Sequence, residues 1–231
     1  RIPLPCFQSF FVGLLGRFIT SEHFPLSPLG LIHTRQSLAL MRCVTADEAL
    51  DLSCTLTRME KTDKGIESVF SLTARAGGET VWKGESVFLT RARKKTSKKE
   101  GPRTETEPLP LLESVTAPRG TGRRYALVSG DYNPHHLFTL TAWLFGFKRA
   151  IAHGMWTLAR SLAGTDRLAG LHTPCRAEAR FKLPVFMPAR LRLGARTFQS
   201  DPAGLLDIRF DLRDARDNRP HLEGTITRRG G

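Results

Sequence analysis

Cysteine is scarce in this sequence, and its spacing argues against two common ways of stabilising a chain. Only four cysteines occur in 231 residues, they lie far apart, and none forms a Cys-x-x-Cys pair or sits beside a histidine cluster. This pattern argues against a structural zinc site and against a disulfide framework. We therefore expect no metal ion, and we expect a reducing compartment, the cytoplasm, as the location.

The sequence also lacks an apolar run long enough to cross a bilayer. Its most apolar stretch runs from Phe7 to Ile19 and contains Arg17, whereas a membrane-spanning helix needs about 20 consecutive apolar residues. A secretory signal has a run of this length, but no small-residue cleavage site follows it here. We therefore expect a buried helix over this stretch and no contact with a membrane.

Acidic residues are few relative to basic ones. The chain has 22 Asp and Glu against 35 Lys and Arg, a formal net charge of +13, which favours polyanionic partners. Nucleic acid is one candidate, but Phe and Tyr do not alternate with the basic residues in an RNA-binding motif, so we expect no nucleic acid. A generally basic proteome would give the same charge without any functional meaning.

The composition changes between Arg93 and Leu109, where charged residues and prolines replace apolar ones. Such a stretch cannot bury enough apolar surface to offset the entropy of ordering it. We therefore predict a charged flexible linker over residues 93–109. A nucleic-acid or localisation patch is the alternative interpretation of its basic residues.

The segments on either side of this linker follow the same order. An apolar helical stretch precedes strand-like runs in the first half, and a helix near Gly154–Gly164 precedes such runs in the second. The sequence therefore predicts an α+β protein with two similar halves, residues 1–92 and residues 110–231. The expected strands are Leu38–Met41, Leu50–Arg58, Gly65–Ala74, Thr80–Leu89, Arg176–Leu183, Ala189–Phe198, Leu205–Arg213 and His221–Thr227.

One segment of the second half combines residues that can transfer protons. Asp131 and His136 lie five residues apart, and Gly130 and Pro134 make a regular helix through this segment unfavourable. A helical stretch then begins at Gly154. A carboxylate and an imidazole beside the N-terminus of a helix suit the addition or removal of water next to a thioester carbonyl.

The string Tyr-x-x-x-Ser-Gly-Asp-x-Asn-Pro-x-His resembles the signature of the MaoC-like family, the R-specific enoyl-CoA hydratases and 3-hydroxyacyl dehydratases. The family usually has an aliphatic residue before the motif histidine, where this chain has His135. The matching positions are Tyr125, Ser129, Gly130, Asp131, Asn133, Pro134, His136, Gly146, Phe147, Ala152, His153, Gly154 and Met155.

This resemblance implies a double hot-dog fold, in which two antiparallel sheets each wrap a long helix. It also implies that residues 1–92 form a degenerate, non-catalytic hot-dog and that residues 110–231 form the catalytic one, because only the second half contains Gly-Asp-x-Asn-Pro. The sequence begins without Met on the approach to the first helix. We therefore expect the first hot-dog to be N-terminally truncated by one strand.

The resemblance also assigns roles to residues. It implies that Asp131 and His136 form the catalytic pair, and that the N–H of Gly154 stabilises the thioester oxyanion. Ser129 and Asn133 are expected near the substrate, chiefly to hold the loop. We interpret His153 as a structural hydrogen-bonding group.

The expected substrate is an acyl-CoA or an acyl carrier protein thioester, which would also account for the positive charge. Arg180 and Lys182, on a basic strand face, are candidates for binding the phosphates of coenzyme A, with a solvated sheet face as the alternative. No cofactor is expected, because the chemistry is proton transfer. A homodimer is a further possibility for the assembly of the protein. The rival interpretations are a (3R)-hydroxyacyl carrier protein dehydratase of fatty-acid synthesis and a non-catalytic acyl-thioester binding protein.

Overall fold

The computed structural model describes residues 1–28, 30–91, 107–171, 174–199 and 205–229. Most of the predicted linker therefore lies outside the described residues. In the first half, a 3-10 helix (Leu4–Cys6) leads into two short α-helices and four strands. These elements are α1 (Phe7–Phe10), α2 (Val12–Ile19), β1 (Leu31–Leu40), β2 (Asp51–Thr62), β3 (Gly65–Ala76) and β4 (Glu79–Arg91).

The second half has five strands and a long helix, with three shorter helices between the first strand and the long helix. The strands are β5 (Leu111–Ala117), β6 (Cys175–Phe181), β7 (Ala189–Gln199), β8 (Leu205–Asp214) and β9 (Pro220–Arg229). The helices are α3 (Thr121–Ser129), α4 (Pro134–Leu137), α5 (Thr139–Leu144) and α6 (Gly154–Ala169). None of the helices among the described residues is both long and apolar enough to span a membrane.

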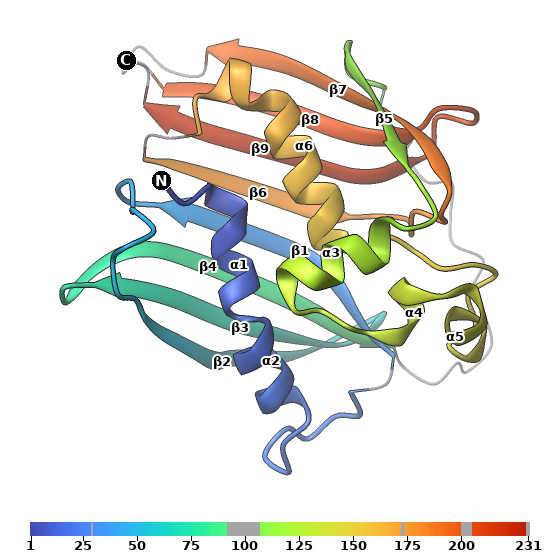
Figure 1. Cartoon of the computed structure of the whole chain (residues 1–231), viewed down its shortest axis with the longest axis horizontal. Coiled ribbons are helices and arrows are strands. Elements are labelled where there is room, and N and C mark those ends of the chain that lie inside the picture. The colour runs from blue at the N-terminus through green and yellow to red at the C-terminus, as the bar shows by residue number, and fades with distance from the viewer. Residues whose placement is uncertain (29, 92–106, 172–173, 200–204, 230–231) are drawn as a thin grey trace.

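All nine strands belong to one antiparallel sheet, in the order β2-β3-β4-β1-β6-β9-β8-β7-β5. The helices lie on one face of this sheet, with α1 and α2 over the first half and α6 over the second (Figure 1). The α+β prediction is confirmed, but the two expected sheets are joined into one. The two halves meet where β1 pairs with β6, and Leu38 lies opposite Ala177 at this seam.

Along the strands, buried and exposed side chains alternate between the two faces of the sheet. Along β6, Cys175, Ala177 and Ala179 are buried while Arg176 and Glu178 are exposed, because successive side chains of a strand point to opposite faces. The buried residues are small, so the helical layer can pack closely on the sheet. The exposed residues form an outer, charged face.

The apolar stretch at the N-terminus forms two helices rather than one, and these are buried on one face only. Phe7 and Phe11 are fully buried, and both rings stack on Trp82 with centroid distances of 5.6 and 5.3 Å. Aromatic stacking of this kind adds roughly 0.5–1.5 kcal/mol per pair beyond the burial of area. The predicted single buried helix is therefore replaced by two short helices that bury one face, and their buried aromatic rings pack on Trp82.

Candidate active site

Three side chains from separate elements converge beneath the start of α6. Asp131 follows α3, His136 lies in α4, and His153 immediately precedes α6. One donor atom from each of the three lies within 4.8 Å of the others. His136 and His153 are only 8% and 2% exposed, whereas the side chain of Asp131 is 37% exposed. The structure therefore brings together the predicted pair, Asp131 and His136, and adds a second imidazole.

The loop that carries Asp131 is held by its own hydrogen bonds. Helix α3 ends at Ser129, and Gly130 adopts the left-handed conformation with φ 75°, which glycine tolerates without a steric penalty. The Ser129 hydroxyl donates to the carbonyl of Tyr125 (2.8 Å) and accepts from the N–H of Asp131 (3.2 Å). The N–H of Asn133 donates to Asp131 Oδ1 at 3.2 Å. Ser129 and Asn133 are thus placed to orient the carboxylate.

The short helix α4 sets the position of His136 and packs directly on the backbone of α3. A Cβ added at Gly122 would lie 1.9 Å from the carbonyl oxygen of His136, a distance that no side chain can occupy. Only glycine therefore allows the two helices to approach this closely. The sequence analysis missed Gly122, because its importance comes from a contact with a residue 14 positions away.

The hydrogen bond of His136 fixes which ring nitrogen can act as a base. Nδ1 lies 2.8 Å from the carbonyl oxygen of Ile151, and since a carbonyl can only accept, Nδ1 must carry the proton. The Nε2 lone pair is then left for chemistry. Burial, and secondarily the neighbouring His153 and His135, lower the pKa of His136 well below its usual value. His136 is therefore a neutral imidazole near pH 7.

His153 supports both members of the pair. Its Nε2 lies 3.0 Å from the backbone carbonyl oxygen of Asp131 and 3.8 Å from the carboxylate oxygen Oδ2. Its ring lies against that of His136, with a centroid distance of 3.7 Å. Burial lowers the pKa of His153, although the Asp131 carboxylate acts in the opposite direction. The interpretation of His153 as a purely structural residue understated its position, and its place before Gly154 in the motif was the available signal.

His135 lies next to His136, and burial lowers its pKa while the Asp131 carboxylate acts in the opposite direction. Its ring lies 5.4 and 5.6 Å from the rings of Phe145 and Phe147, and 4.1 Å from that of His136. It packs among aromatic side chains and is not part of the Asp131, His136 and His153 cluster. This position favours His136 as the imidazole that faces the substrate.

Gly154 is the first residue of α6, where backbone N–H groups lack helical partners. The residue before the helix provides no side-chain capping bond, so the partial positive charge of the helix start faces the cluster. A Cβ at Gly154 would lie 3.2 Å from the ring of Phe181. Glycine at this position therefore lets the ring of Phe181 pack closely against the start of the helix.

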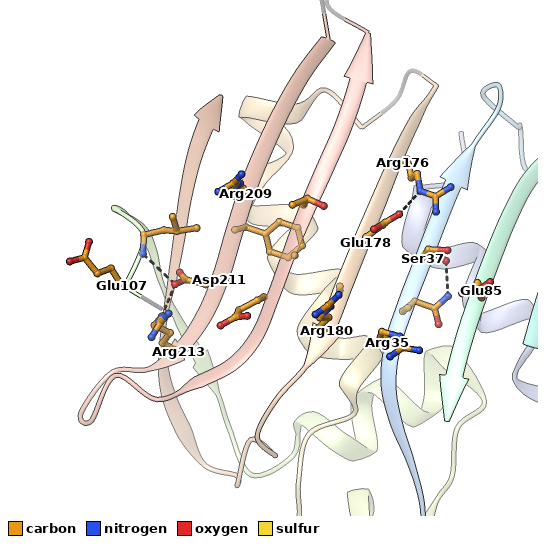
Figure 2. A pocket seen from close by; sticks show the side chains of 17 residues that line it. Arg35, Ser37, Glu85, Glu107, Arg176, Glu178, Arg180, Arg209, Asp211 and Arg213 are labelled. Atoms are coloured by element: carbon orange, nitrogen blue, oxygen red, sulfur yellow. Dashed lines mark hydrogen bonds and ion pairs between the residues drawn. The ribbon is translucent and has the colours of Figure 1, made fainter. Parts of the chain in front are cut away.

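The two predicted phosphate-binding residues lie elsewhere. Arg180 projects from the outer face of the sheet, opposite the helices, into a shallow cleft of about 680 Å³ (Figure 2). The next residue, Phe181, faces the helical layer, so the thickness of the sheet separates Arg180 from Asp131. This placement does not support contact between Arg180 and a substrate bound at His136. Lys182 forms an ion pair with Glu223 at 2.8 Å, and its predicted role stays a prediction.

The three site residues also form a donor set that suits a transition metal in composition. Two of the four imidazole nitrogens are already committed, however, because His136 Nδ1 and His153 Nε2 bond to carbonyl oxygens. His136 Nε2 and His153 Nδ1 remain, and they belong to rings that pack against each other with an interplanar angle of 30°. The geometry therefore suits proton transfer better than chelation.

A second hollow, of about 720 Å³, lies beside the catalytic loop on the solvent side. It is mainly apolar, and two arginines contribute to it. Its lining residues are Pro118, Gly120, Arg123, Arg124, Leu127, Tyr132, Leu137 and Phe138. This hollow could not be identified from the sequence, because its walls come from α3, from the end of α4 and from the segments that flank these helices.

Comparisons with known proteins agree with this geometry. The sequence profile of the MaoC like domain matches residues 93–202. The chain is 29% identical over 210 residues to 3-hydroxyacyl-thioester dehydratase X of Mycobacterium tuberculosis, covering 90% of this chain and 72% of that protein. It is 28% identical over 175 residues to the peroxisomal enoyl-CoA hydratase 2 of Arabidopsis thaliana, covering 67% and 55% of the two chains.

The fold is shared with solved structures as well. A crystal structure of HtdX from Mycobacterium tuberculosis superposes with a TM-score of 0.81 at 26% identity, covering 100% of this chain and 89% of the other. A MaoC-like dehydratase superposes with a TM-score of 0.82 at 17% identity, covering 99% and 84%. The hot-dog arrangement predicted from the sequence is confirmed by these likenesses, while the predicted loss of one N-terminal strand stays a prediction.

Proposed function

Because the second half of the chain is a MaoC-like domain, we propose that the protein adds water R-specifically to 2-enoyl thioesters and removes it from (3R)-hydroxyacyl thioesters. The observation that carries this proposal is the His136 imidazole. Its Nδ1–H is tied to Ile151, so that Nε2 is an available base on a residue that clusters with Asp131. The protein is accordingly a hydro-lyase of fatty-acid metabolism.

In the hydration direction, one water molecule lies between Asp131 and His136. One of the pair removes a proton from the water as its oxygen bonds to the β carbon of the substrate, and a proton is delivered to the α carbon. The pair returns to its starting protonation state, and the product has gained one hydroxyl and one hydrogen. A positioned acid or base of this kind contributes roughly 10²–10⁴-fold to the rate.

Negative charge develops on the thioester oxygen while the α carbon awaits its proton. The N–H of Gly154 is placed to stabilise that charge, since it lies at the positive end of α6. Ser129 and Asn133 maintain the direction of the Asp131 carboxylate through the hydrogen bonds of the loop. The chemistry requires no cofactor.

The proposal is tested by following the absorbance of the conjugated enoyl thioester when the purified protein is added to crotonyl and longer-chain substrates. We expect absorbance to fall and a (3R)-hydroxyacyl product to form, detectable with an R-specific dehydrogenase. A product of the opposite configuration, or no turnover of coenzyme A, pantetheine and carrier-linked substrates alike, would overturn the proposal.

A non-catalytic acyl-thioester binding protein is the alternative of a different class. The closed geometry of Asp131, His136 and His153 weighs against it, because a binding protein has no need of two buried neutral imidazoles beside a carboxylate. A homodimer remains a proposal that size measurement in solution would test.

A further inference from the structure

Helices α3 and α5 expose an unusual amount of apolar surface. Five large apolar side chains on these two helices are between 71% and 79% exposed. Helix α4 packs against both α3 and α5, and exposed apolar residues on neighbouring elements commonly mark a surface that binds a partner. We call this group the α3–α5 surface, and its members are Leu127, Val128, Leu140, Trp143 and Leu144.

The charges around the α3–α5 surface are almost all positive. Between Pro118 and Ile151 the sequence has five basic residues and a single acidic one, Asp131. Within the described part of the chain, no ion pair involves any of the five. The basic residues are Arg119, Arg123, Arg124, Lys148 and Arg149.

Two of these arginines stand at the hollow next to the catalytic loop. Arg123 donates to the carbonyl of Leu137 and lies over the ring of Phe138, 5.1 Å from its centroid. Arg124 lines the same hollow, together with Tyr132, the residue after Asp131. The guanidinium groups are therefore held beside the loop.

Solvent reaches the catalytic cluster at Asp131, whose neighbour Tyr132 lines the hollow. Asp131 is the only partly exposed member of the cluster, whereas His136 and His153 are buried beneath it. A substrate that enters past Asp131 leaves its carrier group outside, next to Tyr132 and the arginines. The α3–α5 surface therefore lies where the carrier group of the thioester would rest.

Three kinds of occupant differ in what they would cover. A second copy of the chain related by a two-fold axis would bring two sets of unpaired basic residues together, which is unfavourable. A nucleotide would engage arginines but leave the five apolar side chains in water. An acidic protein complements the charge and is large enough to cover the apolar residues as well.

We infer that the α3–α5 surface docks an acidic carrier protein that bears the acyl group on a phosphopantetheine arm. This inference rests on the proposed function, because it assigns the carrier of the same thioester substrate. Arg123 and Arg124 meet the acidic residues of the carrier, and Leu140 and Leu144 meet its apolar residues. The arm then reaches past Tyr132 toward His136.

Direct binding tests the inference without relying on catalysis. The full-length protein is titrated with a purified acyl carrier protein at low salt, and the Kd is measured again at higher salt. We expect Arg123→Glu with Arg124→Glu to weaken binding at least tenfold, and Leu140→Asp with Leu144→Asp to do the same at both salt concentrations. Lys83→Glu is the matched control, because it makes a similar charge reversal at an exposed residue of β4. We expect the control to bind as the unchanged protein does.

Activity distinguishes this partner from the other occupants. The same acyl group is supplied on the carrier protein, on coenzyme A and on pantetheine, and KM is compared for each variant. We expect the variants to raise KM for the carrier-linked substrate at least tenfold more than for the pantetheine thioester. An equal increase for the coenzyme A and carrier substrates would overturn the inference in favour of a nucleotide site.

A lipid surface is tested with anionic phospholipid vesicles. Sedimentation with vesicles that is lost in the same variants, while carrier binding is kept, would overturn the inference. Failure of every thioester to react would contradict the proposed function alone. In that case, carrier binding that the variants abolish and Lys83→Glu preserves would still support the docking surface.

Discussion

Two clusters of buried polar side chains, one in each half of the chain, differ in how their hydrogen-bonding groups are used. In the first half, Gln8, Gln36 and Ser86 bond to one another beneath α1, with three hydrogen bonds of 2.7 to 3.3 Å. In the second half, His136 Nε2 and the buried Nδ1 of His153 stay open beside the carboxylate of Asp131. A closed polar network stabilises a core, whereas open polar groups lower stability and allow chemistry. The comparison favours a structural role for the Gln8, Gln36 and Ser86 cluster and a chemical role for the Asp131, His136 and His153 cluster.

The comparison is tested most strongly by removing the reactive groups. We expect Asp131→Asn and His136→Ala each to lower kcat by at least about two orders of magnitude, because each removes a positioned acid or base. Both variants should fold, as circular dichroism would verify. His135→Leu is the matched control, since it keeps an apolar contact with Phe145 and Phe147, and we expect less than about a threefold loss. Equal damage by His135→Leu would mean that the wrong imidazole has been assigned.

A smaller effect is expected from the backbone contact beneath His136. Gly122→Ala places a methyl group where the carbonyl oxygen of His136 lies, so α4 must shift. We expect stability to fall by roughly 1–3 kcal/mol and kcat to fall with it. Gly16→Ala in α2 is the control, because nothing lies within 4 Å of its added Cβ, and it should stabilise the protein by up to about 1 kcal/mol. Denaturant unfolding and turnover, measured on the same samples, would show whether the two effects separate.

The closed network of the first half should affect stability alone. Gln36→Leu leaves the polar groups of Gln8 and Ser86 buried without this partner, at a cost of roughly 1–3 kcal/mol. We expect kcat per folded molecule to be unchanged, because the network lies under α1 and not at the catalytic loop. A fall in kcat without loss of stability would contradict the division of roles between the two halves.

The pH dependence of stability and that of activity should also be separable, because they involve His33 and His136 to different degrees. We expect these effects to be the smallest. Burial lowers the pKa of His136 below its usual 6.5 and that of His33 to about 4. In both cases the unfolded chain binds the proton first, so stability is constant above about pH 6.5 and is lost as the pH falls toward the folded pKa. Activity should also fall on the acid side, as His136 Nε2 becomes protonated.

His33→Phe should reduce the acid sensitivity of stability and leave the acid limb of the kcat/KM profile in place. Thermal unfolding and initial rates, measured from pH 4 to pH 8, provide both curves. A kcat/KM profile that shifts together with the stability curve would contradict the assignment of the acid limb to His136.

Much of the sheet could be predicted because strand patterns are local. All eight expected strands are present, although β1 begins at Leu31 rather than Leu38, since Thr34, Arg35 and Gln36 interrupt the apolar pattern. Strand β5 was missed because it follows the charged linker. Helix α3 was missed because Arg123 and Arg124 precede Tyr125, so no apolar stripe is visible.

The site could be predicted only where its residues share one motif. Asp131 and His136 lie in one string, so their pairing is visible in the sequence. His153 joins them from 17 residues beyond His136, through the packing of α6, and Gly122 contributes through a backbone contact. Arg180 illustrates a different limit of prediction from sequence. The alternation of side chains along β6 does make one face of the strand basic, but that face is the outer face of the sheet, away from Asp131, His136 and His153.

The seam between β1 and β6 has a consequence for how the chain holds together. Each of these strands lies at the margin of its own half and satisfies the backbone groups of the other. Separation of the halves would therefore expose two rows of unpaired amides and carbonyls, which favour aggregation. Opening the halves like a hinge is correspondingly unfavourable, so the halves should melt in one cooperative transition. The first half thereby keeps the marginal strand of the second half paired within the same chain.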